Sequence, residues 1–385
     1  MDNFTYHNYT NVVFGKDTET EAGVLTKALG NKTLLHYGGG SIRQSGLYDR
    51  VVASLQAAGV DFVELSGVQP NPRLNLVREG IDLCRRVGVD CILAVGGGSV
   101  IDSAKAIAVG VPYDGDVWDF YTQKSKPETT LPIGVVLTIP AAGSETSTSS
   151  VISDEATYAK LGLRYQGYRP QFAILNPELT YSLPPYQLAC GVCDMLAHIM
   201  ERYFSSTQGV DFTDRLCEGG MRSILHIAPK LLDDPDDYDT RANLMWASCV
   251  AHGGILGVGR QEDWASHRLS HQISAWWHDL AHGAALSIAL PAWMKYVYRE
   301  NLPLFIQWAQ RVMDVDLTFS DPDAIVLEGI RRLEAFFRRL DLPVRLSEID
   351  ADDRYSEAMA EKCVGVGAVK KLTKEDAIAI YRLML

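Results

Sequence analysis

The sequence predicts an α/β domain over residues 1–184 followed by an all-helical domain over residues 185–385. In the first region, short β-rich runs alternate with helical patterns, which is typical of a layered domain with a mostly parallel sheet. In the second region, long amphipathic stretches with the helical period dominate. Pro177, Pro184 and Pro185 lie between the two patterns. Because a residue before proline is disfavoured in a helix, we place the domain boundary there.

The individual elements follow from the same periodicities. The expected strands of the first domain are residues 33–37, 61–65, 90–95, 133–139 and 172–175. The expected helices of the second domain are residues 185–204, 212–232, 241–256 and 324–340. The acidic run LLDDPDDYDT, residues 231–240, lacks the glycine and terminal glutamate of an EF-hand calcium loop. We therefore expect a solvated loop between helices there.

Composition narrows the class of protein. The 385 residues are 47% hydrophobic, enough for a large core, and the net charge of -12 disfavours nucleic acid or an anionic membrane as the main partner. A small-molecule partner fits better. The sequence shows neither a secretory leader nor an apolar run of about 18 residues, and its seven cysteines are odd in number and scattered. We expect reduced thiols and a cytoplasmic protein without a membrane segment.

Two glycine-rich turns follow expected strands. CILAVGGGSVIDSAKAIA places Gly97, Gly98 and Ser99 between a strand and a helix whose first turn includes Asp102. Glycines let the backbone approach a pyrophosphate closely, and the helix N-terminus attracts its charge. An upstream turn, KTLLHYGGGSIRQSG, repeats the pattern with residues 38–41. Two such turns at the carboxyl ends of parallel strands predict a dinucleotide site, although a tight turn without ligand is the alternative.

The first turn also indicates which dinucleotide would bind. An acidic residue there would hold a ribose 2′-hydroxyl and repel a 2′-phosphate, but this turn carries only small residues, with Arg43 nearby. This pattern favours NADP over NAD. A third segment, LTIPAAGSETSTSS, follows another expected strand and is by itself an ordinary polar loop.

Two pairs of residues in the helical region can bind a metal. Asp194 and His198 are four residues apart, so a helix places both on one face. His267 and His282 form the second pair, but on one unbroken helix they would lie roughly 22 Å apart, too far to share an ion. The chain must therefore bend between them if both bind. The alternative is one helix with its histidines on a solvated face.

Cys190 and Cys193 form a CxxC directly before Asp194. No second CxxC follows and the surrounding pattern is helical, so core packing is preferred to a redox or zinc role. His36, His226 and His252 are likewise interpreted as structural.

Together these segments resemble the iron-containing, or group III, alcohol dehydrogenases, in particular their NADP-dependent butanol dehydrogenase branch. The resemblance runs nearly end to end and is carried by NYTNVVFGK, YGGGSI, QPNPR, AVGGGSVIDSAK, LTIPAAGSETS, LPPYQLACGVCDMLAHIMERYF, DWASHRLSHQISA and HGAALSIALPAWMKY. It implies a Rossmann-like dinucleotide-binding domain joined to a helical metal-binding domain, the dehydroquinate synthase-like fold. A departure from the family pattern is SAWWHDLAH, which is longer than in relatives and leaves the roles of His278 and Asp279 open.

The resemblance also assigns residues. It implies the metal ligands Asp194, His198, His267 and His282, with His271 and His278 in the catalytic cleft near the metal. It implies cofactor contacts at Gly38, Gly39, Gly40, Ser41, Gly97, Gly98, Ser99, Asp102, Thr138, Ser147, Lys160 and Leu183.

The implied activity is reversible oxidation of primary alcohols such as butanol to aldehydes. The cofactor would be NADP(H), with NAD as the alternative, and the metal Fe²⁺ or Zn²⁺, because three imidazoles and a carboxylate suit several divalent ions. The resemblance further implies a homodimer. A related metal-dependent polyol (glycerol-type) dehydrogenase, a non-redox cyclising enzyme and a catalytically silent nucleotide-binding protein are the alternatives.

Overall fold

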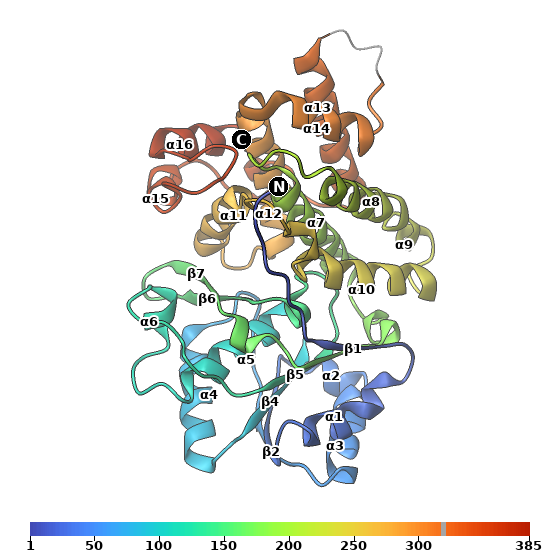
Figure 1. Ribbon diagram of the computed structural model, residues 1–385, viewed down its shortest axis with the longest axis vertical. Coiled ribbons are helices and arrows are strands. Elements are labelled where there is room, and N and C mark those ends of the chain that lie inside the picture. Colours follow the sequence, from blue (N-terminus) through green and yellow to red (C-terminus); the bar gives the residue numbers. More distant parts are fainter. Residues whose placement is uncertain (317–320) are drawn as a thin grey trace. The chain divides into compact units, whose positions relative to one another are not determined.

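Figure 1 shows the computed structural model, which describes residues 1–316 and 321–385. Its contacts divide the chain into two compact units. The α/β unit comprises His7–Leu183 and Arg241–Cys249; the helical unit comprises Met1–Tyr6, Pro184–Thr240 and Val250–Leu385. The predicted domains, residues 1–184 and 185–385, stay a prediction. The contacts add that Arg241–Cys249, from the middle of the helical sequence, packs with the α/β unit, where the Cys249 carbonyl accepts a hydrogen bond from Thr146 Oγ1 at 3.0 Å.

The α/β unit is built on a six-stranded parallel sheet of order β1-β8-β5-β4-β2-β3. Its strands are β1 (Asn11–Phe14), β2 (Lys32–Tyr37), β3 (Asp61–Leu65), β4 (Cys91–Gly96), β5 (Ile133–Leu137) and β8 (Phe172–Leu175). Tyr37 is level with Val95, and Gly96 is level with Leu137. The turns that follow β2, β4 and β5 therefore emerge side by side at the carboxyl edge of the sheet, where open α/β sheets bind ligands.

Helices cover both faces of this sheet (Figure 1). One core includes residues of α1 (Ala22–Lys27), α2 (Ser41–Gln44) and α3 (Leu47–Ala57). The other includes residues of α4 (Leu74–Val87), α5 (Gly98–Gly110) and α6 (Trp118–Tyr121). The neighbours Leu34 and Leu35 of β2 belong to different cores, because successive side chains of a strand point to opposite faces. Burial on both sides explains why the central strands are apolar runs rather than alternating patterns.

Strands β2, β3, β4, β5 and β8 confirm the five expected from the sequence. Three short strands were not expected: β1, and the antiparallel pair β6 (Ser149–Asp154) and β7 (Ala159–Arg164). The sequence of β6 and β7 is dominated by small and polar residues, so it lacks the apolar signal of a core strand. Their segment is ordered instead by polar contacts described below.

The helical unit contains α7 (Pro185–Tyr203), α8 (Asp211–Ile227), α9 (Lys230–Asp233), α11 (Ala265–Trp276), α12 (His282–Val297), α13 (Leu302–Arg311), α14 (Pro322–Arg339), α15 (Ser356–Glu361) and α16 (Lys374–Arg382). Helix α10 (Tyr238–His252) contributes residues to both units. The single helix expected over residues 212–232 is wrong: α8 ends at Ile227 and α9 begins at Lys230. Pro229 separates them, because its ring clashes with the preceding turn and it has no N–H to donate.

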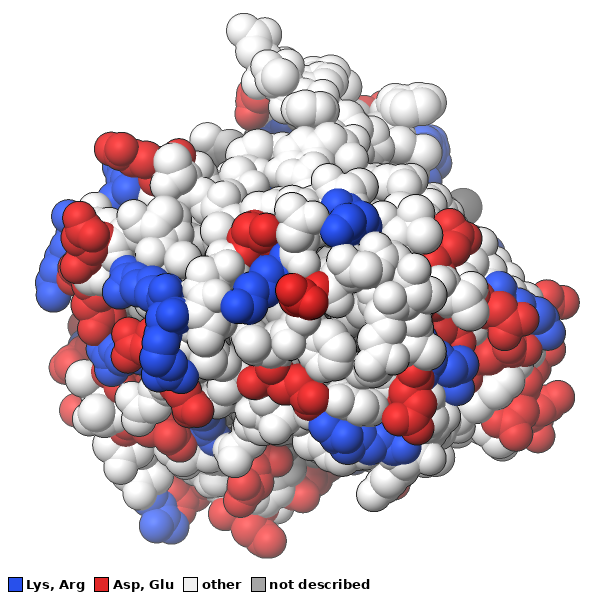
Figure 2. Space-filling view, turned by 90° about the horizontal axis from the view of Figure 1, so that it is seen from below, with Lys and Arg blue, Asp and Glu red and all other residues white. Residues whose placement is uncertain are grey.

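Among the described residues, none of the helices combines the length and apolarity needed to span a bilayer. On the face seen in Figure 2, Lys and Arg are interspersed with Asp and Glu. All seven cysteines are buried free thiols. Burial raises the pKa of Cys190 to about 12 and raises that of Cys193 well above its ordinary value, so the CxxC carries neutral thiols inside helix α7.

Candidate metal centre and nucleotide loops

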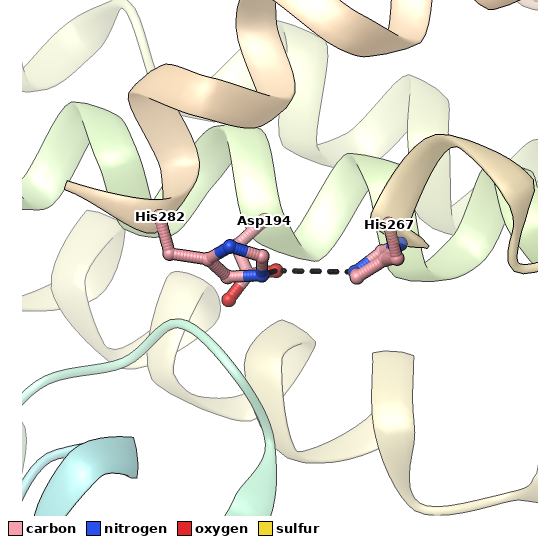
Figure 3. Close-up of side chains that lie close together, drawn as sticks. All are labelled: Asp194, His267 and His282. Atoms are coloured by element: carbon pink, nitrogen blue, oxygen red, sulfur yellow. Dashed lines mark ion pairs between the residues drawn. The ribbon is translucent and has the colours of Figure 1, made fainter. Parts of the chain in front are cut away.

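Three side chains from three helices meet in the helical unit (Figure 3). Asp194 on α7, His267 on α11 and His282 at the start of α12 each offer a ligand atom, and these atoms lie within 4.8 Å of one another. The Asp194 Oδ1 atom is 3.6 Å from His267 Nε2 and 3.8 Å from His282 Nε2. These separations are too long for hydrogen bonds, but two ligands of a tetrahedral ion with bonds of about 2.0–2.1 Å are roughly 3.3–3.4 Å apart.

His198 lies one helical turn from Asp194 and adjoins this cluster. Its Nδ1 atom is 3.6 Å from the Asp194 Oδ1 atom, and its ring stacks on that of His267 with centroids 4.7 Å apart. A second ring neighbour of His198 is His252, at 4.2 Å between centroids. His252, which was expected to be structural, therefore lies beside a predicted ligand. Its Nδ1 is 3.0 Å from an Arg202 guanidinium nitrogen.

The bend that the sequence required is present. Helix α11 ends at Trp276 and α12 begins at His282, so His267 and His282 belong to different helices. The solvated-helix alternative is wrong, because His267 is only 5% exposed. Close packing of α12 on α7 depends on Gly283, where a Cβ atom would lie 2.1 Å from the carbonyl oxygen of Cys190. Only a glycine lets His282 approach α7 this closely.

The burial and the hydrogen bonding of these side chains suit a bound cation. Asp194 and His267 are 4% and 5% exposed, and Asp194 Oδ1 and His267 Nε2 have no hydrogen-bond partner among the described residues. A buried polar atom without a partner costs about 1–3 kcal/mol, which a shared ion would offset. One carboxylate with neighbouring imidazoles is also a donor set that divalent transition metals bind. The residues fit a metal.

The electrostatics agree with this arrangement. Burial lowers the pKa of His267, but the neighbouring Asp194 and Glu201 carboxylates outweigh burial and raise it above the ordinary value. Two carboxylates therefore stabilise positive charge at this imidazole. The same two carboxylates would stabilise a divalent cation bound next to His267.

His271 and His278 occupy different positions. The ring of His271 is 5.2 Å from the His282 ring and 6.3 Å from the His267 ring, so it borders the cluster. His278 is half-buried in the turn between α11 and α12.

In the α/β unit, the predicted cofactor residues lie at the carboxyl edge of the sheet or in the segments beside it. Residues 38–40 connect β2 to α2, which begins at Ser41, and Gly97 precedes α5, whose first residues are Gly98 and Ser99. A Cβ atom at Gly97 would lie 2.9 Å from the Ile139 side chain, so the turn packs tightly against the segment after β5. Thr138 lies in that segment and donates its N–H to the Gly96 carbonyl at 3.1 Å.

Buried polar contacts order the third loop. Asp102 accepts hydrogen bonds from Ser144 Oγ at 2.7 Å and from the Val151 N–H at 2.9 Å. Burial raises the pKa of Asp102. Lys105, which sequence reasoning missed, donates to oxygens of Ser144, Ser147 and Ser149. Burial lowers the pKa of this ammonium group to about 8. The available signal was a lysine directly before the apolar run AIAV and three residues after Asp102.

The remaining predicted contacts are more dispersed. Lys160 on β7 is 5% exposed and donates to Asn71 Oδ1 at 2.8 Å. Ser147 is buried, and its Oγ lies 3.3 Å from Lys105 Nζ. Leu183 is the last residue of this part of the α/β unit and donates its N–H to the Thr180 carbonyl at 3.0 Å.

Sequence reasoning also missed Glu201. It is completely buried on α7, and its carboxylate lies 3.1 Å from His267 Nδ1. Its position seven residues after Asp194 and three after His198, on the same helical face, was a usable signal.

Glycine turns at the carboxyl edge of a parallel sheet are typical of nucleotide-binding domains, and a buried carboxylate–imidazole cluster is typical of a metal site. Together they indicate the class of proteins that bind both a nucleotide and a metal. Comparison with known proteins specifies the class. The family model for iron-containing alcohol dehydrogenase matches residues 10–177, and the model for the C-terminal part of the Fe-containing alcohol dehydrogenase family matches residues 188–385. The chain belongs to the iron-containing alcohol dehydrogenase family.

Individual relatives cover the chain end to end. It is 40% identical over 388 residues to a probable NADH-dependent butanol dehydrogenase 1 of Bacillus subtilis, covering 100% of both chains. It is 35% identical to the NADPH-dependent aldehyde reductase YqhD of Escherichia coli, covering 94% of this chain and 93% of the relative. The crystal structure of NADH-dependent butanol dehydrogenase A from Thermotoga maritima superposes with a TM-score of 0.95 at 36% identity, covering 100% and 99% of the two chains.

These findings confirm the family and the fold class expected from the sequence. The protein is an oxidoreductase of the alcohol dehydrogenase and aldehyde reductase type that uses a nicotinamide cofactor and a metal.

Proposed function

We propose that this protein interconverts primary alcohols, such as butanol, and their aldehydes. The observation that carries the proposal is the buried cluster of Asp194, His267 and His282, with His198 beside it. The names of the butanol dehydrogenases and of the aldehyde reductase among its relatives support the substrate class.

The proposed metal ligands are Asp194, His198, His267 and His282, and the proposed ion is Fe²⁺ or Zn²⁺. The family supports iron, while the donor set suits either ion. When bound, the ion would supply Lewis-acid polarisation of the substrate oxygen, and the nicotinamide would supply hydride transfer. The chain itself would hold both in place and exclude water from the buried Asp194 and His267 side chains.

The proposed cofactor is NADP(H), with contacts at the twelve positions expected from the sequence. Arg43 supports this preference over NAD. It lies just after the first glycine turn, donates to the Tyr37 hydroxyl at 2.8 Å and packs over the Tyr48 ring at 3.7 Å. The Glu64 carboxylate also accepts from Arg43 at 2.8 Å, so a 2′-phosphate would compete with Glu64 for this guanidinium. The named relatives include both NADH- and NADPH-dependent enzymes. The preference for NADP(H) over NAD(H) is therefore argued from the residues of this chain and not from membership of the family.

We assign proton transfer to His271, with His278 as the second candidate. His271 borders the cluster, and an imidazole titrates in the range where it can take up a proton from an alcohol and return it. His271→Asn should reduce kcat and alter its pH profile without changing the amount of bound metal. His278→Asn is the matched comparison.

Cytoplasmic location and a homodimer remain part of the proposal. Seven buried free cysteines support a reducing compartment, and light scattering of the purified protein would measure the assembly.

The activity is tested with purified protein by following the absorbance of reduced nicotinamide with butanal. The untreated, chelator-treated and Fe²⁺- or Zn²⁺-reloaded forms are compared. We expect chelation to remove turnover and reloading to restore it, while NADPH binding persists. Full turnover in the metal-free protein would contradict the proposed mechanism, and a metal-loaded protein that oxidised glycerol in preference to butanol would contradict the substrate class.

A further inference from the structure

Glu201 is a buried carboxylate whose contacts lead to the metal cluster. It lies on α7, the helix that also carries Asp194 and His198, and its exposed fraction is 0%. Residues four and seven positions apart on a helix share a face, so all three side chains are presented toward α11. A fully buried charge is expensive unless donors surround it, and Glu201 has several.

Four donors converge on this carboxylate, all from the start of α11. The Trp264 N–H donates to Oε2 at 2.6 Å. The Ser266 hydroxyl and the His267 N–H donate to Oε1 at 2.6 and 2.9 Å. The fourth contact is the side chain of His267, with Nδ1 at 3.1 Å from the same Oε1. Glu201 therefore satisfies free N–H groups at the N-terminus of α11 and contacts a predicted metal ligand at the same time.

The contact with the ring fixes which nitrogen of His267 carries the proton. A carboxylate accepts hydrogen bonds and has no proton to donate, so Nδ1 of His267 is the donor. The lone pair of the neutral ring is then on Nε2, which faces Asp194 Oδ1 at 3.6 Å. Coordination of a metal through Nε2 requires this tautomer. If Nδ1 lacked its acceptor, the ring could rotate or adopt the other tautomer.

We propose that Glu201 is a positioning residue that holds His267 in its metal-binding orientation and tautomer. The inference rests on the proposed function, since it assigns His267 to the metal. Through the same carboxylate, Glu201 fixes the first turn of α11 against α7, so two predicted ligand-bearing helices are joined at one buried group.

The test compares Glu201→Gln with Ser266→Ala in the full chain. Glutamine keeps the size of the side chain but removes its charge and places an amide donor against N–H donors. Ser266→Ala removes one donor to the same oxygen without touching the imidazole. The metal is removed, and Co²⁺ is titrated back by calorimetry and by its visible absorption, which reports the coordination geometry.

We expect Glu201→Gln to bind Co²⁺ about 10–100-fold more weakly, with an altered absorption spectrum. Mutating a residue that hydrogen-bonds to a metal ligand typically weakens metal binding by this factor. Ser266→Ala should bind Co²⁺ with an affinity close to that of the wild type. Equal affinities for Glu201→Gln and the wild type would overturn the inference, as would an equal loss in Ser266→Ala, which would indicate helix capping alone.

A measurement on the unaltered protein covers the case in which Glu201→Gln does not fold. Nitrogen-15 spectra of the metal-loaded wild type should show His267 protonated at Nδ1, and protonation at Nε2 would overturn the inference. A wild type that binds Co²⁺ but does not reduce aldehydes with NADPH would contradict the proposed function and not the role of Glu201. Unchanged Co²⁺ affinity in Glu201→Gln, with aldehyde reduction intact in the wild type, would contradict the role of Glu201 alone.

Discussion

The candidate site of the helical unit is made of side chains, whereas that of the α/β unit is made largely of backbone. Asp194, His267 and His282 come from three helices and depend on how those helices pack. The turns at residues 38–41 and 97–99 instead offer backbone N–H groups at the ends of parallel strands. The two sites should therefore fail differently. Truncating a side chain damages the first, whereas adding atoms or charge to a glycine damages the second.

The two units also use buried histidines in opposite ways. In the helical unit, two carboxylates raise the pKa of His267, which favours positive charge at that position. In the α/β unit, burial lowers the pKa of His36 to about 4. His36 lies between the Leu65 carbonyl at 2.8 Å and Ser103 Oγ at 2.9 Å, so it acts as a neutral part of the core. Burial alone does not identify a ligand; the carboxylates around the ring do.

The largest expected effect is that of His267→Ala. Mutating a residue that only hydrogen-bonds to a metal ligand typically weakens metal binding by about 10–100-fold. Loss of a ligand itself should therefore weaken metal binding by more than about 100-fold and reduce turnover to background. NADPH binding, measured by fluorescence titration, should not change. His226→Ala, at an exposed histidine of α8, is the matched control and should leave both properties intact. Retention of metal by His267→Ala would show that the helical site does not depend on this side chain.

Gly283→Ala should come next. Its methyl group would lie 2.1 Å from a backbone oxygen of α7, so the helices must separate. We expect the free energy of unfolding to fall by about 1–3 kcal/mol in denaturant titrations, together with weaker metal binding. Gly219→Ala on α8 meets nothing within 4 Å and should be neutral or slightly stabilising. Equal stability of the two variants would contradict the close approach of α12 to α7.

The pH dependence of stability tests the neutral role of His36. Its pKa of about 4 in the folded protein is below the ordinary value of 6.5, so the unfolded chain takes up the proton first as the pH falls. The stability that His36 contributes is complete above pH 6.5 and is lost as the pH falls toward 4. By linkage, roughly 2 kcal/mol should be lost by about pH 5. His36→Asn should show a correspondingly flatter dependence in urea titrations, and an unchanged slope would refute this assignment.

The smallest expected effect concerns charge at the first glycine turn. A Cβ atom at Gly39 would meet nothing within 4 Å, so Gly39→Asp adds a carboxylate with little steric cost. It should raise the Kd of NADPH about tenfold, corresponding to about 1.4 kcal/mol, and change that of NADH less. Gly39→Asn, the uncharged equivalent, separates charge from size. An equal loss of both cofactors in Gly39→Asp would argue against a 2′-phosphate at this turn.

Local patterns in the sequence were sufficient for five strands of the parallel sheet, for most of the expected helices and for part of each site. The strands β2, β4 and β5 could be predicted because burial on both faces makes them apolar runs. Asp194 and His198 could be paired because residues four apart share one face of a helix. The requirement for a bend between His267 and His282 also followed from sequence, because helical rise alone forbids a shared ion. These properties depend on neighbours along the chain.

The tertiary structure decided the contacts between segments distant in sequence. Sequence periodicity could not reveal that Glu201 contacts the ring of His267, that Gly283 packs on the Cys190 carbonyl, or that Arg241–Cys249 joins the α/β unit. Each depends on helix packing, which brings together residues with no periodic relation. The chain thus specifies its candidate ligands locally, while packing determines their orientation, because a distance across two helices is not a property of either helix alone.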